Sequence, residues 1–389
     1  MNDFSLMVSR EIDHAEWRWV FVCSIALLVL ITFPFVWAYG VGGSDAHFMG
    51  VLVNPIDGAS YQAKMRQGVE GSWLFYLPFT PDLHDGVFLF TFYLAMGHLA
   101  RILSLPVITV FHGVRLVGAV LMFFAIYRFV ADWTSSVEQR RLAWSLAVLG
   151  AGLGWLAIVF GISSPDLLAI PEAFPLQAAY ANAHFPWAIA AGMLVAHVLV
   201  VKCAADEDAV PALDIETVGL AAASVFLATT SPFVLLPIGI GFGAMLAWLI
   251  WQRRELPRRE LAWGLVVLIF VFPFAAYSAW VMVVGNPAIA AWMEQNVTPS
   301  PPVWDYLIAF GPLLMLALPG IWASRRKMEA VDIFLLSWLV GGALLLYAPF
   351  SLQRRFTMGL IMPLAVYAGR GLWRVILPKI AERRRGLVI

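Results

Sequence analysis

The stretch that decides the fold is WVFVCSIALLVLITFPFVWAY, residues 19–39, which contains no charged side chain. A helix needs about 20 mainly apolar residues to cross roughly 30 Å of hydrocarbon. The run is continuous rather than alternating, which is typical of a spanning helix and not of a barrel strand. Because the run lacks a small-residue cleavage site, we expect an uncleaved first span after a cytoplasmic segment, residues 1–18.

The rest of the chain repeats this pattern. Of its 389 residues, 61% are hydrophobic and only 13% are charged, whereas soluble domains are about 25% charged. The sequence therefore predicts an all-α, multi-pass protein of the inner or plasma membrane, forming a single transmembrane domain over residues 1–389 with about ten or eleven transmembrane helices. We place these spans near 19–39, 87–104, 107–128, 142–162, 184–203, 217–231, 233–252, 261–284, 304–323, 330–348 and 356–374.

Short basic clusters follow several of the apolar runs. RRELPRRE (253–260), SRRK (324–327) and KIAERRRG (379–386) lie beside expected spans. The positive-inside rule places such clusters in the cytoplasm. With them inside, the tail at 375–389 is cytoplasmic and the polar segment 40–86 is the first extracytoplasmic loop.

One region conflicts with this topology. If residues 87–104 cross the membrane, Arg128, Arg140 and Arg141 fall on the outer side. Either residues 87–104 are re-entrant or lie in the membrane plane, or the positive-inside rule fails locally.

The first outer loop carries the richest set of polar side chains. Its segment NPIDGASYQAKMRQG (54–68) places Asp57 and Tyr61 four residues apart, on one face of a helix. Small and apolar neighbours allow such a helix to lie against the membrane surface, so we expect interfacial amphipathic helices in this loop. The alternative is that a long outer loop is polar simply because water covers it.

Two further groups lie on the expected outer face. Arg354 and Arg355, in YAPFSLQRRF, sit between apolar runs on the side where arginines are normally scarce. A guanidinium pair can bind a lipid phosphate bidentately, or it can anchor the chain by reaching lipid headgroups. Glu172 and His184 form an acid and imidazole pair that could bind an acceptor, although an isolated loop carboxylate is often only solvated.

Several classes of site are absent from the sequence. It contains no P-loop, no His-Glu-x-x-His and no Gly-x-Ser-x-Gly elbow. Asp82, His84 and Asp85 could hold a divalent metal, but we expect neither a metal nor another cofactor. The balanced charge gives no reason to expect a nucleic-acid partner.

The order of these features resembles the GT-C superfamily of membrane glycosyltransferases, which use polyprenyl-phosphate sugars. Asp57, Tyr61, Ala63 and Gly68 match a pattern like Asp-x-x-x-Tyr-x-Ala-x-x-x-x-Gly found in the first outer loop of such proteins. The helix HGVRLVGAV and the turn ATTSPFVLLP are also similar to that superfamily. In the superfamily a second acid often follows the aspartate directly, whereas here Gly58 follows it.

The resemblance implies transfer of a sugar from an undecaprenyl- or dolichyl-type phosphate to an acceptor hydroxyl at the extracytoplasmic face. Asp57 is the expected general base, with Asp45 as the second choice. Arg354 and Arg355 are expected to hold the lipid phosphate, with Lys64 and Arg66 as alternatives. The expected partners are membrane lipids and a glycan, lipid or protein acceptor, and the expected substrate-binding residues are Tyr61, His84, Asp85, Glu172 and His184.

Two other functions remain open at this stage. A transporter or flippase of a polar or lipid-linked substrate would show charges or broken helices near the bilayer midplane, and often internal repeats. This chain instead concentrates charge at the outer ends of its expected helices. A non-catalytic subunit of a glycan-assembly complex is the other alternative.

Overall fold

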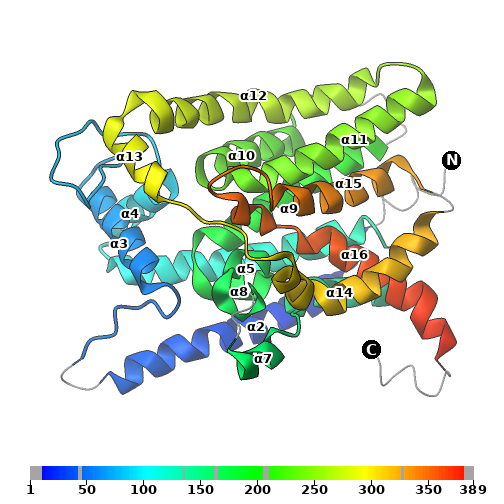
Figure 1. Ribbon diagram of the computed structural model, residues 1–389, viewed down its shortest axis with the longest axis horizontal. Helices are drawn as coiled ribbons and strands as arrows, with labels where there is room; N and C mark the ends of the chain where they lie inside the picture. Colours follow the sequence, from blue (N-terminus) through cyan, green and yellow to red (C-terminus); the bar gives the residue numbers. More distant parts are fainter. Residues whose placement is uncertain are drawn as a thin grey trace.

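The computed structural model describes residues 11–42, 46–134, 136–161, 165–204, 210–325 and 328–380. Within these ranges the chain forms helices and no strand, which confirms the predicted all-α fold (Figure 1). The expected cytoplasmic segment 1–18 and the basic tail 375–389 lie partly outside the described residues.

Eight helical segments in the described ranges are long and apolar enough to cross a membrane, which confirms a multi-pass membrane protein. Two shorter apolar helices also run from one end of the bundle to the other, which gives ten such helices in the described ranges. The long segments are α2 His14–Val41, α5 Val107–Ala131, Val137–Phe160 beginning with α6 Val137–Leu149, α9 His184–Ala204, Pro232–Arg253 with α11 Leu235–Arg253, Arg258–Gly285 with α12 Arg258–Trp280, α14 Val303–Ser324, and Gln353–Lys379 with α16 Ile361–Gly371; the shorter ones are α10 Ile215–Thr230 and α15 Ala330–Leu345.

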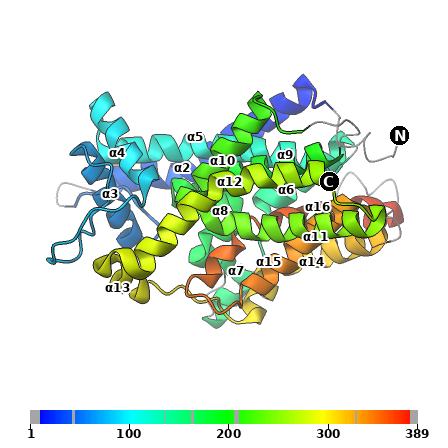
Figure 2. The ribbon, with the colours of Figure 1, turned by 90° about the horizontal axis from the view of Figure 1, so that it is seen from above.

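In the described ranges, four further helices lie in the connections between these segments. They are α3 Pro55–Val69, α4 Thr91–Leu103, α8 Pro175–Ala181 and α13 Pro287–Gln295, while the short α7 Gly154–Ala157 belongs to the segment Val137–Phe160. Both ribbon views place α3, α4 and α13 together at one end of the bundle (Figures 1 and 2). We call this the loop end, and the opposite end, where α2 begins, the basic end.

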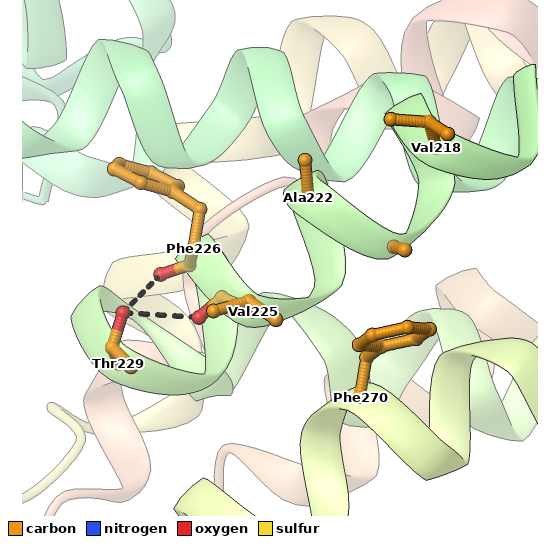
Figure 3. Close-up of a pocket in the computed structure, with 7 residues that line it drawn as sticks. Val218, Ala222, Val225, Phe226, Thr229 and Phe270 are labelled. Carbon is orange, nitrogen blue, oxygen red and sulfur yellow. Dashed lines mark hydrogen bonds between the residues drawn. The ribbon is translucent and has the colours of Figure 1, made fainter. Parts of the chain in front are cut away.

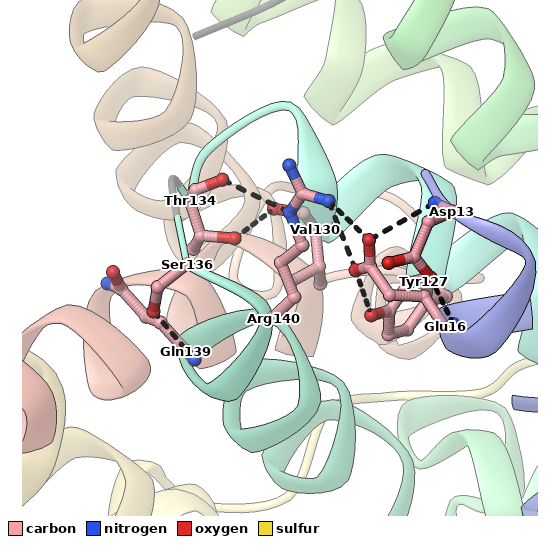
Figure 4. Close-up of polar contacts among 8 residues, drawn as sticks. All are labelled: Asp13, Glu16, Tyr127, Val130, Thr134, Ser136, Gln139 and Arg140. Atoms are coloured by element: carbon pink, nitrogen blue, oxygen red, sulfur yellow. Dashed lines mark hydrogen bonds and ion pairs between the residues drawn. The ribbon is translucent and has the colours of Figure 1, made fainter. Parts of the chain in front are cut away.

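A buried ion pair joins three helices at the basic end (Figure 4). Glu16, in the first turn of α2, accepts from Nη1 of Arg140 on α6 at 2.9 and 3.0 Å and from the Tyr127 hydroxyl of α5 at 2.5 Å. Asp13 caps α2, with its side chain accepting from the backbone N–H of Glu16. The start of α2, the end of α5 and the start of α6 therefore lie at the same end.

A second buried pair extends this network to α14, α15 and α16. Arg370, near the end of α16, donates to Asp332 in the first turn of α15 at 2.5 Å. Its other contacts are the Trp133 carbonyl just after α5 and the Ser324 hydroxyl at the end of α14, both at 3.4 Å. Three more helix ends are thereby fixed at the basic end.

The remaining helices join the network through the end of α9, where Nδ1 of His197 lies 2.6 Å from Oδ2 of Asp132, just after α5. Arg259, at the start of α12, donates to the carbonyl of Cys203 on α9 and also contacts Glu260. Arg253, at the end of α11, pairs with Glu260 at 2.8 Å. Lys202 of α9 pairs with Glu216 in the first turn of α10. All ten helices therefore reach the basic end with alternating direction.

The predicted span at 87–104 is wrong. Its helix, α4, has 13 residues, which is about 20 Å and too short to cross roughly 30 Å of hydrocarbon. It packs instead on α3, where a Cβ on Gly97 would lie 2.0 Å from the Met65 carbonyl oxygen. With α4 on the loop side, Arg128 and Arg140 lie at the basic end with the other arginines, and the topological conflict disappears.

The helix predicted at residues 54–68 is present as α3, and its packing shows which face is buried. Gly58, Lys64, Met65 and Gly68 are its buried residues. Gly68 approaches α4 so closely that a Cβ there would lie 2.1 Å from the Leu94 carbonyl oxygen. The face that was expected to rest on a membrane surface therefore includes the contact with α4.

The core of the bundle surrounds α16, in which every residue is buried. By contrast, α12 buries only Glu260 and Trp263 and runs along the edge of the bundle in Figure 1. In water such an apolar, exposed helix would be unstable, so α12 is suited to contact with lipid on its outer side.

Candidate functional site

Polar side chains from five separate segments gather at the loop end. They come from α3, from α4, from the segment between α7 and α8, from the start of α9, and from the turn Gln353–Thr357 that precedes α16. We call the cluster formed by Asp57, Tyr61, Tyr93, Glu172, His184, Arg354 and Arg355 the loop-end cluster; its members are linked by the contacts and charge interactions given below.

Two stacked tyrosines and a histidine form its centre. The rings of Tyr61 and Tyr93 are 4.4 Å apart and nearly parallel. The Tyr93 hydroxyl lies 2.7 Å from Nδ1 of His184, the first residue of α9. Burial raises the pKa of both tyrosines well above the usual 10, and the Asp57 carboxylate adds to this. Both phenols therefore stay neutral and can act as hydrogen-bonding groups near pH 7.

Arg355 lies within electrostatic reach of this centre, and neither it nor the adjacent Arg354 has an ion-pair partner among the described residues. Nε of Arg354 and Nε of Arg355 are buried and make no hydrogen bond, and no ion pair to either residue is found in the described part of the chain. The Arg354 backbone N–H donates to the Thr298 carbonyl, which fixes the turn against the segment after α13. The Arg355 guanidinium lies 5.9 Å from the ring of Phe233. Both side chains are half-buried, and a partly buried charge without a partner is costly, so this pair is suited to bind an anion.

Charge interactions connect Arg355 to the two tyrosines, and both Arg354 and Glu172 act on Tyr306 of α14. The Arg355 charge acts on both Tyr61 and Tyr93, where it opposes the rise of their pKa values. It also acts on His184. These three residues and Arg355 come from α3, α4, α9 and the turn before α16, so only the tertiary fold places them within electrostatic reach.

Two carboxylates lie within the same electrostatic range. Asp57 is exposed in the first turn of α3, and Glu172 is 3% exposed in the turn Pro171–Ala173. Each carboxylate raises the pKa of Tyr61. Glu172 makes no ion pair within 4 Å among the described residues. The cluster thus combines two carboxylates with two unpaired guanidinium groups.

A buried arginine positions the segment that carries Glu172 and His184. Arg115, on α5, is fully buried and donates from Nη1 to the Ala179 carbonyl of α8 at 2.7 Å. Its guanidinium also lies 4.6 Å from the ring of Phe35 on α2. Because α8 lies between Glu172 and His184 in sequence, this contact fixes both ends of the segment relative to α5.

Lys64 is buried among aromatic rings rather than exposed to a substrate. It is 3% exposed, and its Nζ donates to the Ser60 hydroxyl at 2.6 Å. The same Nζ lies 4.5 Å from the ring centre of Phe90 and 5.5 Å from those of Tyr61 and Phe75. Burial lowers the pKa of Lys64 to about 8, although Asp57 opposes this change. In this conformation Lys64 holds α3 against the loop at 71–90 by cation–π contacts.

The structure places the other predicted residues away from the loop-end cluster. Arg66 is exposed and pairs with Glu70 at 2.9 Å on α3. Both ring nitrogens of His84 contact backbone groups, and the Asp85 carbonyl accepts from Asn286 beside α13. Asp45 lies outside the described residues, so its prediction has no counterpart in the structure.

Sequence reasoning missed Tyr93 and Asn182. Tyr93 was assigned to a transmembrane span, which hid its position at the start of a short helix. Asn182 is 3% exposed, two residues before His184, and its Oδ1 atom has no hydrogen-bond partner in the described ranges. The only signal in the sequence was an amide beside His184 in the segment YANAHF.

Nothing among the described side chains forms a group of three His, Cys, Asp or Glu residues that could hold a metal ion. Comparison with protein-family models and with curated protein sequences finds no match for this chain.

Proposed function

We propose that the protein transfers a sugar from a polyprenyl-phosphate donor to an acceptor hydroxyl at the loop end. One observation carries this proposal: two half-buried arginines with no ion-pair partner among the described residues lie near two carboxylates and two neutral tyrosines. An anionic leaving group and an acceptor that must lose a proton need these two kinds of side chain. The resemblance of Asp57, Tyr61, Ala63 and Gly68 to the GT-C pattern supports the same reaction.

In the proposed reaction, the acceptor oxygen forms a bond to the anomeric carbon while the bond from that carbon to the phosphate oxygen breaks. Asp57 takes the acceptor proton, an effect worth about 10² to 10⁴ in rate. The electron pair leaves with the polyprenyl phosphate, and Arg354 and Arg355 stabilise the charge that develops there. These arginines act without reorganisation because the turn Gln353–Thr357 already holds them.

The other cluster members are assigned to binding. The Tyr61 hydroxyl makes no hydrogen bond in the described part of the chain, so it is free to contact a sugar hydroxyl. Glu172 and His184 are assigned to the acceptor. In the GT-C pattern a second acid often follows the aspartate, but here Gly58 follows Asp57. In this proposal Glu172, on a different loop, supplies the second carboxylate.

The proposal places the reaction on the extracytoplasmic side. The basic end carries Arg128, Arg140, Arg253 and Arg259, and positive charge favours the cytoplasm. The loop end then faces outward, where a lipid-linked sugar can enter sideways from the bilayer.

The test uses purified protein with several labelled polyprenyl-phosphate sugars. We expect Asp57→Asn to lower turnover by about 10² to 10⁴ and Arg354→Ala or Arg355→Ala to lower it by about 10² or more. Arg325→Ala is the control, because this exposed arginine ends α14 at the basic end. If no donor is turned over, and the cluster variants support the host as well as wild type does, the protein is not this enzyme, and a transporter or a non-catalytic subunit fits better.

A further inference from the structure

A lateral groove runs along α10 where α12 packs beside it. Its volume is about 620 Å³, and Figure 3 shows its walls, with Phe270 of α12 facing the side chains of α10. Phe270 is 41% exposed and Val218 is 48% exposed, so the groove opens to the side of the bundle rather than to either end. The lining residues are Val218, Ala221, Ala222, Val225, Phe226, Thr229 and Phe270.

The sequence of α10 explains why this groove exists. Val218, Ala221, Ala222 and Val225 recur at intervals of three and four residues, which places them on one helix face. Two of them are alanines, so their side chains leave space between the helices. The only polar lining side chain is Thr229, and its hydroxyl already donates to carbonyl oxygens of the preceding turn, at 3.0 and 3.2 Å. The groove offers no free polar side chain and suits a hydrocarbon ligand.

Two series of side-chain contacts link the loop-side end of the groove to the loop-end cluster. Phe226, at its loop-side end, contacts the ring of Phe92 at 5.8 Å, and Phe92 contacts Tyr93 at 5.4 Å. Thr229 begins the turn that continues to Phe233, whose ring faces the Arg355 guanidinium. The loop-side end of the groove therefore lies two ring contacts from Tyr93, and the chain leads from it within four residues to Phe233, the neighbour of Arg355.

Helix α12, which forms the outer side of the groove, is held by contacts near both of its ends and is exposed between them. At the basic end Glu260 of α12 pairs with Arg253, and near the loop end the Tyr277 hydroxyl accepts from the Phe88 backbone N–H at 2.9 Å. Between these contacts α12 presents Leu268 and Phe272, 62% and 71% exposed. A chain dissolved in the bilayer can therefore reach the groove from the side without unfolding either helix.

We infer that the groove binds the isoprenoid chain of the lipid whose phosphate binds Arg354 and Arg355. The inference rests on the proposed function and adds where the donor's chain lies. Charge and shape support one kind of occupant, a lipid with an anionic head and a single hydrocarbon chain. The head would bind the unpaired arginines, and the chain joined to it would lie in the groove between the two neighbouring helices. A two-chain phospholipid would have to leave its second chain outside this groove.

Photolabelling tests the inference without requiring sugar transfer. Purified protein in lipid nanodiscs is labelled with an isoprenyl phosphate that carries a diazirine in its chain, and the labelled residues are identified by mass spectrometry. We expect label on residues 218–229 and on Phe270, displaced by unlabelled undecaprenyl phosphate. Arg354→Ala is expected to lower this labelling, because it removes part of the anchor for the phosphate.

Graded filling of the groove gives the matched variants. Ala222→Leu and Ala222→Phe place larger side chains in an open space, and we expect groove labelling to fall by about tenfold in Ala222→Phe, the loss for displacing about two chain methylenes. Val117→Phe is the control, since Val117 is 53% exposed on α5, outside the groove. Ala222→Leu should give a smaller loss, which separates filling of the groove from misfolding.

Two outcomes would overturn the inference. One is label spread over exposed faces such as α2 in proportion to lipid exposure, which would mean that ordinary bilayer lipid fills the groove. The other is equal labelling by an isoprenyl alcohol, which would separate the groove from the arginines. Sugar transfer without groove labelling would refute only the position of the chain, whereas groove labelling without transfer from any donor would refute only the proposed enzyme.

Discussion

The buried pair between Glu16 and Arg140 yields the sharpest stability prediction. Both side chains are 3% exposed. If Arg140 is replaced by leucine, the Glu16 carboxylate stays buried and keeps only the Tyr127 hydroxyl and the Asp13 backbone N–H, at 2.5 and 3.3 Å. The variant thus removes the only ion-pair partner of Glu16 in the described structure.

The expected cost follows from this loss. Removing one partner of a buried ion pair destabilises a protein by about 3 to 5 kcal/mol. Because the Tyr127 hydroxyl still donates to the carboxylate, we expect the lower value, about 3 kcal/mol. Glu16→Gln removes the buried charge itself, so adding it to Arg140→Leu should recover about 2 kcal/mol, a coupling in the range for residues in one network.

The assay is equilibrium unfolding of the detergent-solubilised protein, measured for both single variants and the double variant. The exposed pair of Arg66 and Glu70 is the control, because i,i+4 pairs on a surface contribute only about 0.3 to 0.5 kcal/mol. The prediction fails if Arg140→Leu lowers the free energy of unfolding by no more than Arg66→Leu does. It also fails if the effects of Glu16→Gln and Arg140→Leu are strictly additive.

Three further predictions follow from the loop end. Lys64 has a pKa of about 8 in the folded protein, against 10.5 for a free lysine. Between these two values the unfolded chain binds more protons than the folded one, so the free energy of unfolding should rise with pH by up to about 3 kcal/mol. In Lys64→Met the rise measured by chemical unfolding should be smaller by that amount. Gly97→Ala should cost about 1 to 3 kcal/mol by forcing α4 away from the Met65 carbonyl, whereas Gly113→Ala, which meets nothing within 4 Å, should not; equal unfolding midpoints would contradict this. Cysteines at Ser72 and Ser104, in a variant without Cys23 and Cys203, should both react with an impermeant maleimide from the same side of the membrane, and labelling from opposite sides would restore a span at 87–104.

Much of the fold was predictable because membrane insertion depends on local composition. Runs such as residues 19–39 must be helical in hydrocarbon, where every backbone group has to be satisfied within the segment. The error at residues 87–104 arose because apolar length alone does not reveal Gly97, whose missing side chain lets α4 pack on α3 outside the span. The same close packing depends on Gly68, which composition cannot distinguish from an ordinary loop glycine.

The site was predicted in its residue types but not in its arrangement. Asp57, Tyr61, Glu172, His184 and Arg355 were all candidates, and the structure brings them within electrostatic reach of one another. Arg66 and Lys64 looked alike in sequence, yet one faces outward beside Glu70 and the other is enclosed by aromatic rings. A difference of two positions on a helix decides this, and the neighbours on that face come from distant segments.

Hydrophobic length and local charge act residue by residue, so the sequence alone predicted membrane-spanning helices with basic clusters beside several of them. Tertiary packing placed residues 87–104 outside the span, joined Glu16 to Arg140 at the basic end, and brought Arg355, without an ion-pair partner in the described ranges, within electrostatic reach of Tyr61. These features depend on contacts between residues up to about three hundred positions apart, which close packing selects and no local pattern encodes.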